Sequence, residues 1–323
     1  MCVTQIQQVL FELDGQYLGH PYFVTGNALF NAIARRVDGE TRRSLCVSHG
    51  VFLPGEYGAY PDNHSQDGYA GKLGQSLPAV ESYADLFVFR DPAQRWLLDS
   101  RPRDAHNAHD VQVHGGRVAF DETCWFGRPA GQRNRRRSVS WYIHCYLHGE
   151  SGGDSVVPVS ADVLDGIRVG GARNYGFGAL SLVDTQLVDV DALDFSRVQA
   201  VHESSEGCRL ELLSPYVLES EHPSGDAQDV PWWWERETGE LNLASGGLRR
   251  RETRFVDGDA TYAVRAVDHG QVVRYVGDDP VETARNGLLR VGTYSRFGFG
   301  EFRVRPAGED RVPERGAATG GEV

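Results

Sequence analysis

The sequence predicts an α+β fold of two related modules, each a small antiparallel sheet backed by helices. Three observations favour this class. Segments with the dense apolar residues of strands outnumber segments with helical spacing. Each half begins with a strand-like segment and closes with a glycine-rich phrase that leads into another strand-like segment. This phrase occurs twice, and repeats within one chain indicate related modules.

The two copies of the phrase share one pattern. Residues 167–180 read IRVGGARNYGFGAL and residues 289–302 read LRVGTYSRFGFGEF. Both copies contain three glycines at matching positions, a leading arginine and two aromatic residues. Glycine permits positive φ and lets a ligand approach the main chain closely. Such a loop is suited to holding a phosphate backbone and to stacking bases on its aromatic rings.

The first elements of the chain can be placed from their patterns. Residues 5–13 (QIQQVLFEL) predict a buried strand. In TGNALFNAIARRV, Thr25 is the expected N-cap of a helix, and apolar residues from Leu29 to Val37 follow helical spacing. Residues 44–53 predict one strand. Residues 54–80, rich in Gly, Tyr, Asp and Pro, predict a long loop.

The rest of the first half alternates between short strands and one short helix. The expected elements are strands at 86–90 and 96–100, a long strand within 137–148, a helix at 160–167 and a strand at 179–188.

The second half repeats this order after a boundary near 196–206. CRLELLSPYVL (208–218) opens a strand-rich unit, TYAVRAV and QVVRYV are strands, and PVETARNG (280–287) is a short helix before the second phrase. The expected division is an N-terminal module with insertions at 1–200, a C-terminal module at 206–305 and a disordered tail at 306–323.

The charge balance bears on the class of ligand. The chain has a net charge of −12, which by itself disfavours nucleic-acid binding. Lys72 is its only lysine, and arginine supplies the other permanent positive charges. An acidic, lysine-poor surface is typical of adaptation to a salt-rich (halophilic) cytoplasm. Because salt weakens counterion-driven binding, an RNA binder there would rely on main-chain hydrogen bonds, bidentate arginine and stacking.

Other features of the composition concern the compartment. The five cysteines are odd in number and form no C-x-x-C pair, which predicts reduced thiols. The sequence contains no run of about 18 apolar residues, and its start lacks the basic region of a signal peptide. We therefore expect a cytoplasmic protein with no membrane partner and no cofactor.

The paired phrases resemble the glycine-rich loops of the RAMP superfamily of CRISPR-associated proteins. The resemblance rests on VGGARNYGFG and VGTYSRFGFG, each after a short helix and before a strand, and on ALFNAI in the opening helix. It implies two ferredoxin-like (RRM-like) modules with antiparallel sheets and Gly-rich loops, and with long insertions in the first module. Many members begin the loop with Gly-aliphatic-Gly, whereas these copies begin Val-Gly-Gly and Val-Gly-Thr.

The resemblance implies one of two roles. The first is a non-catalytic subunit of an antiviral CRISPR effector complex, which holds CRISPR RNA, and especially the 5′ tag of the guide, beside other subunits. The second is a metal-independent endoribonuclease that processes CRISPR repeats, in which a histidine helps a 2′-hydroxyl attack the adjacent phosphate. The subunit is favoured because no acid–base constellation stands out in the sequence.

The predicted RNA-contacting residues lie in the two loops and in the arginine runs QRNRRRS and GLRRRETR. The alternatives are glycines that only form tight turns and arginines that form a solvated face. The loop aromatics could stack on bases, although one of each pair is expected to anchor its loop. The residues are Gly170, Gly171, Arg173, Asn174, Gly176, Gly178, Gly292, Ser295, Arg296, Gly298, Gly300, Arg135, Arg136, Arg137, Arg249, Arg250 and Arg251.

Histidines supply the catalytic and metal candidates. His20, in the loop before the first helix, and His49, beside the second strand, are the candidate catalytic residues, with a packing role as the alternative for each. HNAHDVQVH (106–114) and HCYLH (144–148) place histidines close together, but no compact zinc motif supports them, so we expect no metal.

Two rival classes are weighed against RNA binding. A nucleotide-binding enzyme is disfavoured, because GGARNYGFG lacks both the Lys-Ser/Thr end of a P-loop and the dinucleotide-binding spacing. A β-rich interaction protein without nucleic acid stays open. WWW at 232–234 fits a stacking platform, a partner anchor or a core plug.

Overall fold

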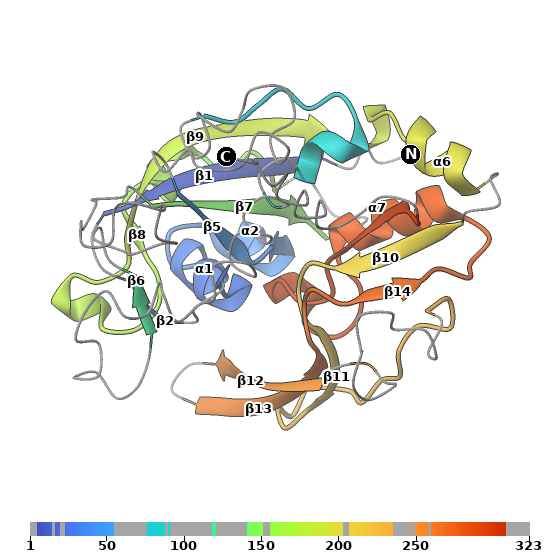
Figure 1. The fold of residues 1–323 in the computed structure, drawn as a ribbon. Coiled ribbons are helices and arrows are strands. Elements are labelled where there is room, and N and C mark those ends of the chain that lie inside the picture. The colour runs from blue at the N-terminus through green and yellow to red at the C-terminus, as the bar shows by residue number, and fades with distance from the viewer. Residues whose placement is uncertain are drawn as a thin grey trace, which may run out of the picture.

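A computed structural model gives the fold (Figure 1). The expected strand at 96–100, the run QRNRRRS and the tail beyond residue 307 lie outside the described part of the chain. No described helix has the length and apolar character needed to cross a membrane. The structure describes residues 5–14, 17–19, 23–54, 76–87, 90, 118–120, 141–150, 156–202, 207–234, 248, 250–257 and 260–307.

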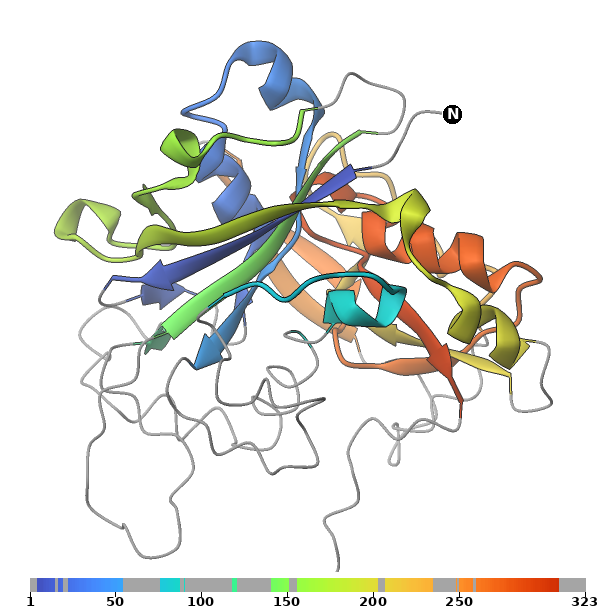
Figure 2. The ribbon, with the colours of Figure 1, turned by 90° about the horizontal axis from the view of Figure 1, so that it is seen from above.

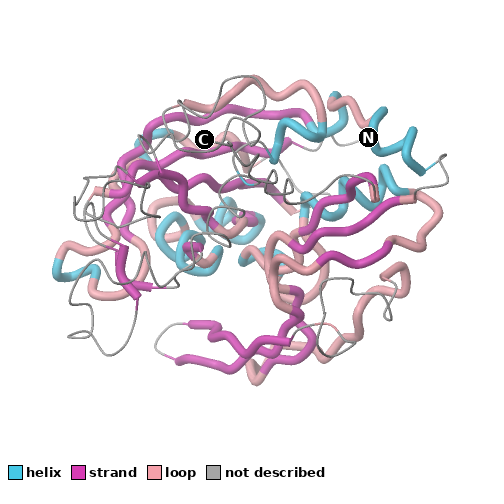
Figure 3. The backbone as a smooth tube through the Cα atoms, in the orientation of Figure 1, coloured by secondary structure: helices cyan, strands magenta, loops and turns pink. Residues whose placement is uncertain are grey.

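A seven-stranded sheet organises the first half of the described chain (Figure 3). Its order is β3-β5-β7-β1-β9-β8, β4 also pairs with β7, and neighbouring strands are antiparallel. A separate short pair joins β2 (Tyr17–Gly19) to β6 (Val118–Phe120). The strands of the large sheet are β1 (Gln5–Leu13), β3 (Phe23–Val24), β4 (Leu45–Val47), β5 (Gly50–Pro54), β7 (Trp141–Gly149), β8 (Ile167–Arg168) and β9 (Ala179–Asp189).

The main strands and helices of this half follow the β-α-β-β-α-β order of a ferredoxin-like module. After β1 come α1 (Gly26–Ile33) and α2 (Gly39–Ser44), then β4 and β5, β7, α5 (Ala161–Leu164) and β9. β1 lies between β7 and β9, and β4 and β5 lie on the far side of β7. The expected α+β class with an antiparallel sheet is confirmed.

Helix α1 forms as its sequence predicts. Thr25 is the N-cap, and its hydroxyl oxygen accepts the N–H of Ala28 at 3.2 Å. Leu29 and Ile33 are fully buried against the sheet. The helix ends at Ile33, so Val37 lies beyond it, before α2 begins.

The strand expected at 44–53 is interrupted. Val47 pairs with Leu147 and Val51 with His144, so three residues face two on β7. This extra residue is a β-bulge, which bends a strand and redirects its side chains. The hydroxyl of Ser48, within the bulge, accepts the N–H of Tyr146 at 2.8 Å. Two strands, β4 and β5, therefore replace the single strand.

The strand expected at 86–90 is wrong. Tyr83–Phe87 form a 3₁₀ helix, η3. The carboxylate of Asp85 accepts the N–H groups of Glu81 and Ser82 at 3.1 and 2.8 Å, which fixes a turn rather than an extended chain. Tyr83 and Phe87, one helical turn apart, are both buried. Local hydrogen bonding thus decided a segment whose apolar residues also fitted a strand.

The second half has two three-stranded antiparallel sheets. One has the order β14-β10-β15 and lies against α7 (Pro280–Leu289), and the other has the order β11-β13-β12. α6 (Ser196–His202) occupies the start of the boundary expected at 196–206 and lies beside α7. The strands are β10 (Cys208–Leu212), β11 (Tyr216–Ser220), β12 (Arg250–Asp257), β13 (Ala260–Val267), β14 (Val272–Arg274) and β15 (Phe302–Pro306).

This second module is a reduced version of the first. β10, β14, α7 and β15 match the first strand, third strand, second helix and last strand of a ferredoxin-like unit. Where its first helix would stand, the described chain carries the sheet of β11, β13 and β12 instead. The glycine-rich loop and its strand are therefore the parts that the two halves share most closely.

The two halves share buried contacts. Ile6 and Val188 of the first sheet belong to the same buried cluster as Leu210 and Val304 of the second half. The segment that carries η3, cyan in Figure 2, lies between them. Tyr83 of that segment accepts the N–H of Val304 through its hydroxyl at 3.0 Å.

A buried ion pair crosses the same junction. The Arg90 guanidinium lies 2.6 Å from the Glu301 carboxylate, and their side chains are 1% and 0% exposed. Arg90 also donates to the Ser48 hydroxyl at 2.8 Å and covers the ring of Tyr146 at 4.4 Å. One buried cation therefore links an insertion, the β-bulge and the end of the second glycine-rich phrase.

Glu301→Ala should lower the free energy of unfolding by roughly 3–5 kcal/mol, because it leaves the Arg90 charge buried without its partner. Glu219→Ala is the matched control, since Glu219 pairs with Arg265 at 3.0 Å on the surface, where such a pair is worth at most about 1 kcal/mol. Urea unfolding of both variants measures the difference. Equal stabilities would contradict the role given to the buried pair.

Candidate nucleic-acid interface

The two glycine-rich phrases fold into loops with the same backbone. Each contains a short 3₁₀ helix, η5 (Arg173–Tyr175) or η7 (Ser295–Phe297). The residue before each helix is left-handed, with φ of 54° at Ala172 and 63° at Tyr294. Matching main-chain hydrogen bonds close each loop: Val169 N–H to Gly178 at 2.9 Å, and Val291 N–H to Gly300 at 3.1 Å.

The last glycine of each phrase is required by this closure. A Cβ on Gly178 would lie 1.9 Å from the carbonyl oxygen of Val169, and a Cβ on Gly300 would lie 1.9 Å from that of Val291. Both glycines also have positive φ, 67° and 76°. No other residue fits these positions without moving the main chain.

The arginine in the shared pattern has a structural role in both loops. Arg168 donates from Nη1 to the carbonyl of Arg173 at 2.9 Å, and Arg290 donates from Nε to the carbonyl of Ser295 at 2.8 Å. These carbonyls occupy equivalent positions. Each arginine therefore ties the start of its loop to the 3₁₀ helix, which explains its presence in both copies.

The equivalence extends to a tyrosine that the sequence did not reveal. A Cβ on Gly170 would lie 2.8 Å from the ring of Tyr17, and a Cβ on Gly292 would lie 2.9 Å from the ring of Tyr216. Both tyrosines follow the first strand of their half. In each half this ring supports the start of the loop.

The second loop is docked on the first half. Arg296 donates from Nε to the carbonyl of Leu45 at 3.0 Å, and its guanidinium lies 4.8 Å from the centre of the Phe30 ring. Phe297 meets the same ring edge-on, with centroids 4.9 Å apart. The tip of this loop is thus occupied by protein.

This docking changes the interpretation of the second loop. Gly298 and Gly300 are buried, and a Cβ on Gly298 would lie 2.2 Å from the imidazole of His49. Their packing favours the turn-forming alternative for these two glycines. RNA contact by Gly292, Ser295 and Arg296, which are exposed or half-buried, stays a prediction.

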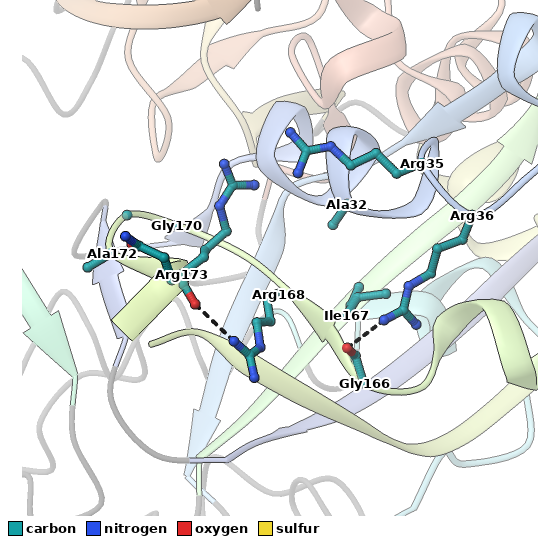
Figure 4. Close-up of a pocket in the computed structure, with 11 residues that line it drawn as sticks. Ala32, Arg35, Arg36, Gly166, Ile167, Arg168, Gly170, Ala172 and Arg173 are labelled. Carbon is teal, nitrogen blue, oxygen red and sulfur yellow. Dashed lines mark hydrogen bonds between the residues drawn. The ribbon is translucent and has the colours of Figure 1, made fainter. Parts of the chain in front are cut away.

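The first loop instead borders an open groove (Figure 4). The groove has a volume of about 770 Å³. Arg35 and Arg36, just beyond α1, lie on one side, and Arg168 and Arg173 come from the loop. Its lining includes Gly170, Gly171, Arg173 and Asn174, all predicted from the sequence to contact RNA.

The four arginines of the groove differ in what they already bind. Arg36 donates to the carbonyls of Val163 and Gly166 at 3.2 and 2.7 Å, and Arg168 holds the loop. Among the residues that the structure describes, neither an ion pair nor a hydrogen bond engages the side chains of Arg35 and Arg173. Two cations therefore face the groove without a carboxylate to neutralise them.

The main chain adds donors beside these cations. Ala172 is left-handed and begins the turn of η5, a sequence of conformations that turns successive N–H groups toward one side. Within the described chain, the N–H groups of Arg173 and Asn174 donate to no acceptor, whereas those of Tyr175 and Gly176 close the turn. In the described chain, two uncommitted N–H groups thus lie beside two arginines without side-chain partners, which is a combination suited to an anion.

Four arginines of the two predicted runs lie outside the described residues: Arg135, Arg136, Arg137 and Arg249. Arg250 is exposed on β12. Arg251, on the opposite face of that strand, lies 3.6 Å from the carboxylate of Asp268. Of the described pair, Arg250 is the one placed to meet a ligand.

The histidine candidates do not form a reactive group in the described chain. His20 lies outside it, and His49 is 2% exposed, where its Nδ1 accepts the N–H of Gly26 at 3.0 Å and its ring stacks on Phe23. A general base must reach the proton that it removes. The catalytic prediction for His49 gains no support from this position.

Of the two histidine clusters considered as metal sites, HCYLH is bonded to protein and HNAHDVQVH lies outside the described chain. His144 bonds to Gln8 at 2.9 Å, and His148 Nε2 accepts from Arg290 at 2.6 Å. HNAHDVQVH cannot be placed. Among the residues described, no three His, Cys, Asp or Glu side chains gather as a metal would require.

The WWW run is split between the alternatives. Trp234 is buried at 2% exposure and packs on Tyr216, Trp233 is half-buried, and Trp232 is 73% exposed. The run is a core plug with one ring outside it.

Sequence reasoning missed three of the four arginines of the groove. Arg35 and Arg36 were assigned to the end of a helix, and Arg168 was recognised in the repeat but not proposed as a site residue. The arginine pair directly after an amphipathic helix was a signal, but only the fold shows that it faces the first loop.

The fold therefore combines two ferredoxin-like units, and one of their glycine-rich loops borders an arginine-lined groove. No protein-family model matches the chain, and neither does any curated protein. A solved structure described as "CRISPR associated protein Cas6" aligns with 94% of this chain and 99% of its own length, at 10% identity and a TM-score of 0.36. A similarity of that size is too low to indicate a function, which is inferred from the groove instead.

The buried histidines predict a loss of stability in mild acid. Burial, together with the nearby charge of Arg290, lowers the pKa of His148 to about 3, and burial also lowers the pKa of His144. Below pH 6.5 the unfolded chain takes up protons that the folded chain refuses, so stability falls as pH drops from about 6.5 toward 3.

His148→Gln tests this, because its amide oxygen can still accept from Arg290. Between pH 6.5 and 5, wild type should lose about 1.6 kcal/mol more stability than the variant, because the slope for one histidine approaches about 1.4 kcal/mol per pH unit only below the unfolded pKa of about 6.5. Urea unfolding at both pH values measures it. Parallel losses in the two proteins would contradict a neutral His148.

Proposed function

We propose that this chain binds RNA by its phosphate backbone, in the arginine-lined groove of the first glycine-rich loop. The observation that carries the proposal is that one groove is lined by Arg35, Arg173 and Asn174, which bring two partner-free guanidinium groups and two uncommitted N–H groups of the described chain together. In a chain of net charge −12, such a local excess of positive charge attracts an anion.

The shape of the groove favours a polyanion. It is open, and glycines at 170 and 171 in its wall let a ligand approach the main chain closely. Main-chain donors and arginine bind phosphate by geometry as well as charge, which suits binding in high salt. Arg250, an exposed arginine of the predicted track that the structure describes, would extend the contact along the second half.

The resemblance of the two loops to those of RAMP proteins supports CRISPR RNA as the ligand. We propose the chain as a subunit of a CRISPR effector complex that holds the guide, especially its 5′ tag, beside other subunits. Burial of His49 disfavours it as the general base of a repeat-processing nuclease, whereas His20, the other candidate base, lies outside the described residues. A β-rich interaction protein without nucleic acid would copurify with no RNA.

Replacing Arg35 and Arg173 together by serine should weaken RNA binding. Neither side chain has a described protein partner to lose, so the fold should survive. The affinity for a labelled 20-nucleotide RNA without secondary structure should fall at least about tenfold. The slope of log K against log salt should become shallower by about 1.4, because each phosphate contact on a single strand contributes roughly 0.7. Fluorescence anisotropy over a salt series measures both.

Arg42→Ser with Arg43→Ser is the matched control, since it removes the same charge from exposed arginines of α2 that do not line the groove. It should change affinity less than about threefold. Equal effects of the two double variants would mean that only net charge matters and would refute the groove. Incubation of the protein with the same RNA in the absence of metal tests for cleavage. Sequencing of the RNA that copurifies with the protein tests whether the bound guides share a 5′ tag.

A further inference from the structure

The tip of the first loop carries an aromatic ring that packs against no other ring of the described chain. Tyr175 is 79% exposed, and a Cβ on the next residue, Gly176, would meet no atom within 4 Å. We infer that Tyr175 is a stacking platform for one base turned out of the RNA, so that this site selects unpaired RNA. The inference rests on the proposed function and adds a base subsite to its phosphate site.

The second loop shows what this position is built to do. Phe297 is the equivalent of Tyr175, and its ring meets the ring of Phe30 edge-on at 4.9 Å. The same backbone therefore presents an aromatic ring outward, where it contacts another ring. In the second loop protein supplies that ring, whereas in the first no ring of the described chain contacts Tyr175.

The tip is held in place before any ligand binds. Tyr175 N–H donates to the carbonyl of Ala172 at 2.9 Å, and Gly176 N–H donates to that of Arg173 at 3.2 Å. Arg168 holds the same carbonyl of Arg173 at 2.9 Å. With its backbone fixed, the tyrosine has only two side-chain torsions to restrict on binding, which keeps the entropy cost of stacking low.

The platform adjoins the phosphate site along the chain. The free N–H groups belong to Arg173 and Asn174, and Tyr175 follows directly. A phosphate held there brings a neighbouring base within reach of the ring. In a duplex that base is paired and stacked inside the helix, so only a single strand can use the phosphate site and the ring together.

Tyr175→Ala should weaken binding of the labelled 20-nucleotide single strand by about tenfold, within the range measured for loss of one base–aromatic stack. Tyr175→Phe is the matched variant, because it keeps the ring, and it should bind as wild type does. The ring is exposed, so thermal melts of both variants should match wild type. Duplex RNA of the same length should bind all three proteins equally.

An abasic scan of the single strand locates the base. In an RNA anchored at one end, removing the base at one particular position should weaken binding to the wild-type protein about tenfold. Removing the same base should not weaken binding to Tyr175→Ala any further. Tyr175→Ala that binds as wild type does, while Arg35→Ser/Arg173→Ser is weakened, would overturn the stacking inference and leave the tip to a protein partner. If the arginine variant also binds normally, the proposed function itself fails, so the two failures are distinguishable.

Discussion

The rest of this structure depends on a close contact between the start of α1 and the second glycine-rich loop, with a glycine on each side of it. A Cβ on Gly26 would lie 2.3 Å from the carbonyl oxygen of Phe297, and a Cβ on Gly298 would lie 2.2 Å from His49 Nδ1. Gly26 also donates its N–H to that nitrogen at 3.0 Å. Because these segments touch, the start of α1 seats the second loop. The buried pair Arg90–Glu301 and the bond from Arg290 to His148 form at the same junction.

This contact gives the two copies of one loop different tasks. Closing hydrogen bonds, left-handed residues and the arginine that ties the loop are the same in both. What differs is the surrounding protein. The second loop packs against Phe30 and His49, whereas the first loop borders a groove lined by arginines. A duplicated backbone that joins the halves in one place is thus free to bind a ligand in the other.

Local rules were enough for the sequence to predict the parts that depend on them. Thr25 caps its helix, and three glycines at one spacing adopt positive φ in both loops. The errors have two causes. The bulge at Ser48 forms against β7, nearly a hundred residues away. The 3₁₀ helix η3 is set by local hydrogen bonds to Asp85, which apolar spacing does not reveal. Which loop is buried is likewise a property of the packing of two halves, and no single phrase encodes it.

The distribution of partners among the arginines explains how an acidic chain can hold the proposed phosphate site. Two buried arginines are paired with buried carboxylates: Arg303 with Glu211 and Arg90 with Glu301, each at 2.6 Å. Such pairs cancel locally, so they contribute little field at the surface. Arg35 and Arg173 have no such partner among the described residues, and their charge is felt at the groove whatever the total. Since screening limits a field to about 3 Å in 1 M salt and to about 8 Å at physiological ionic strength, the charges nearest a phosphate affect its binding more than the sum over the chain does.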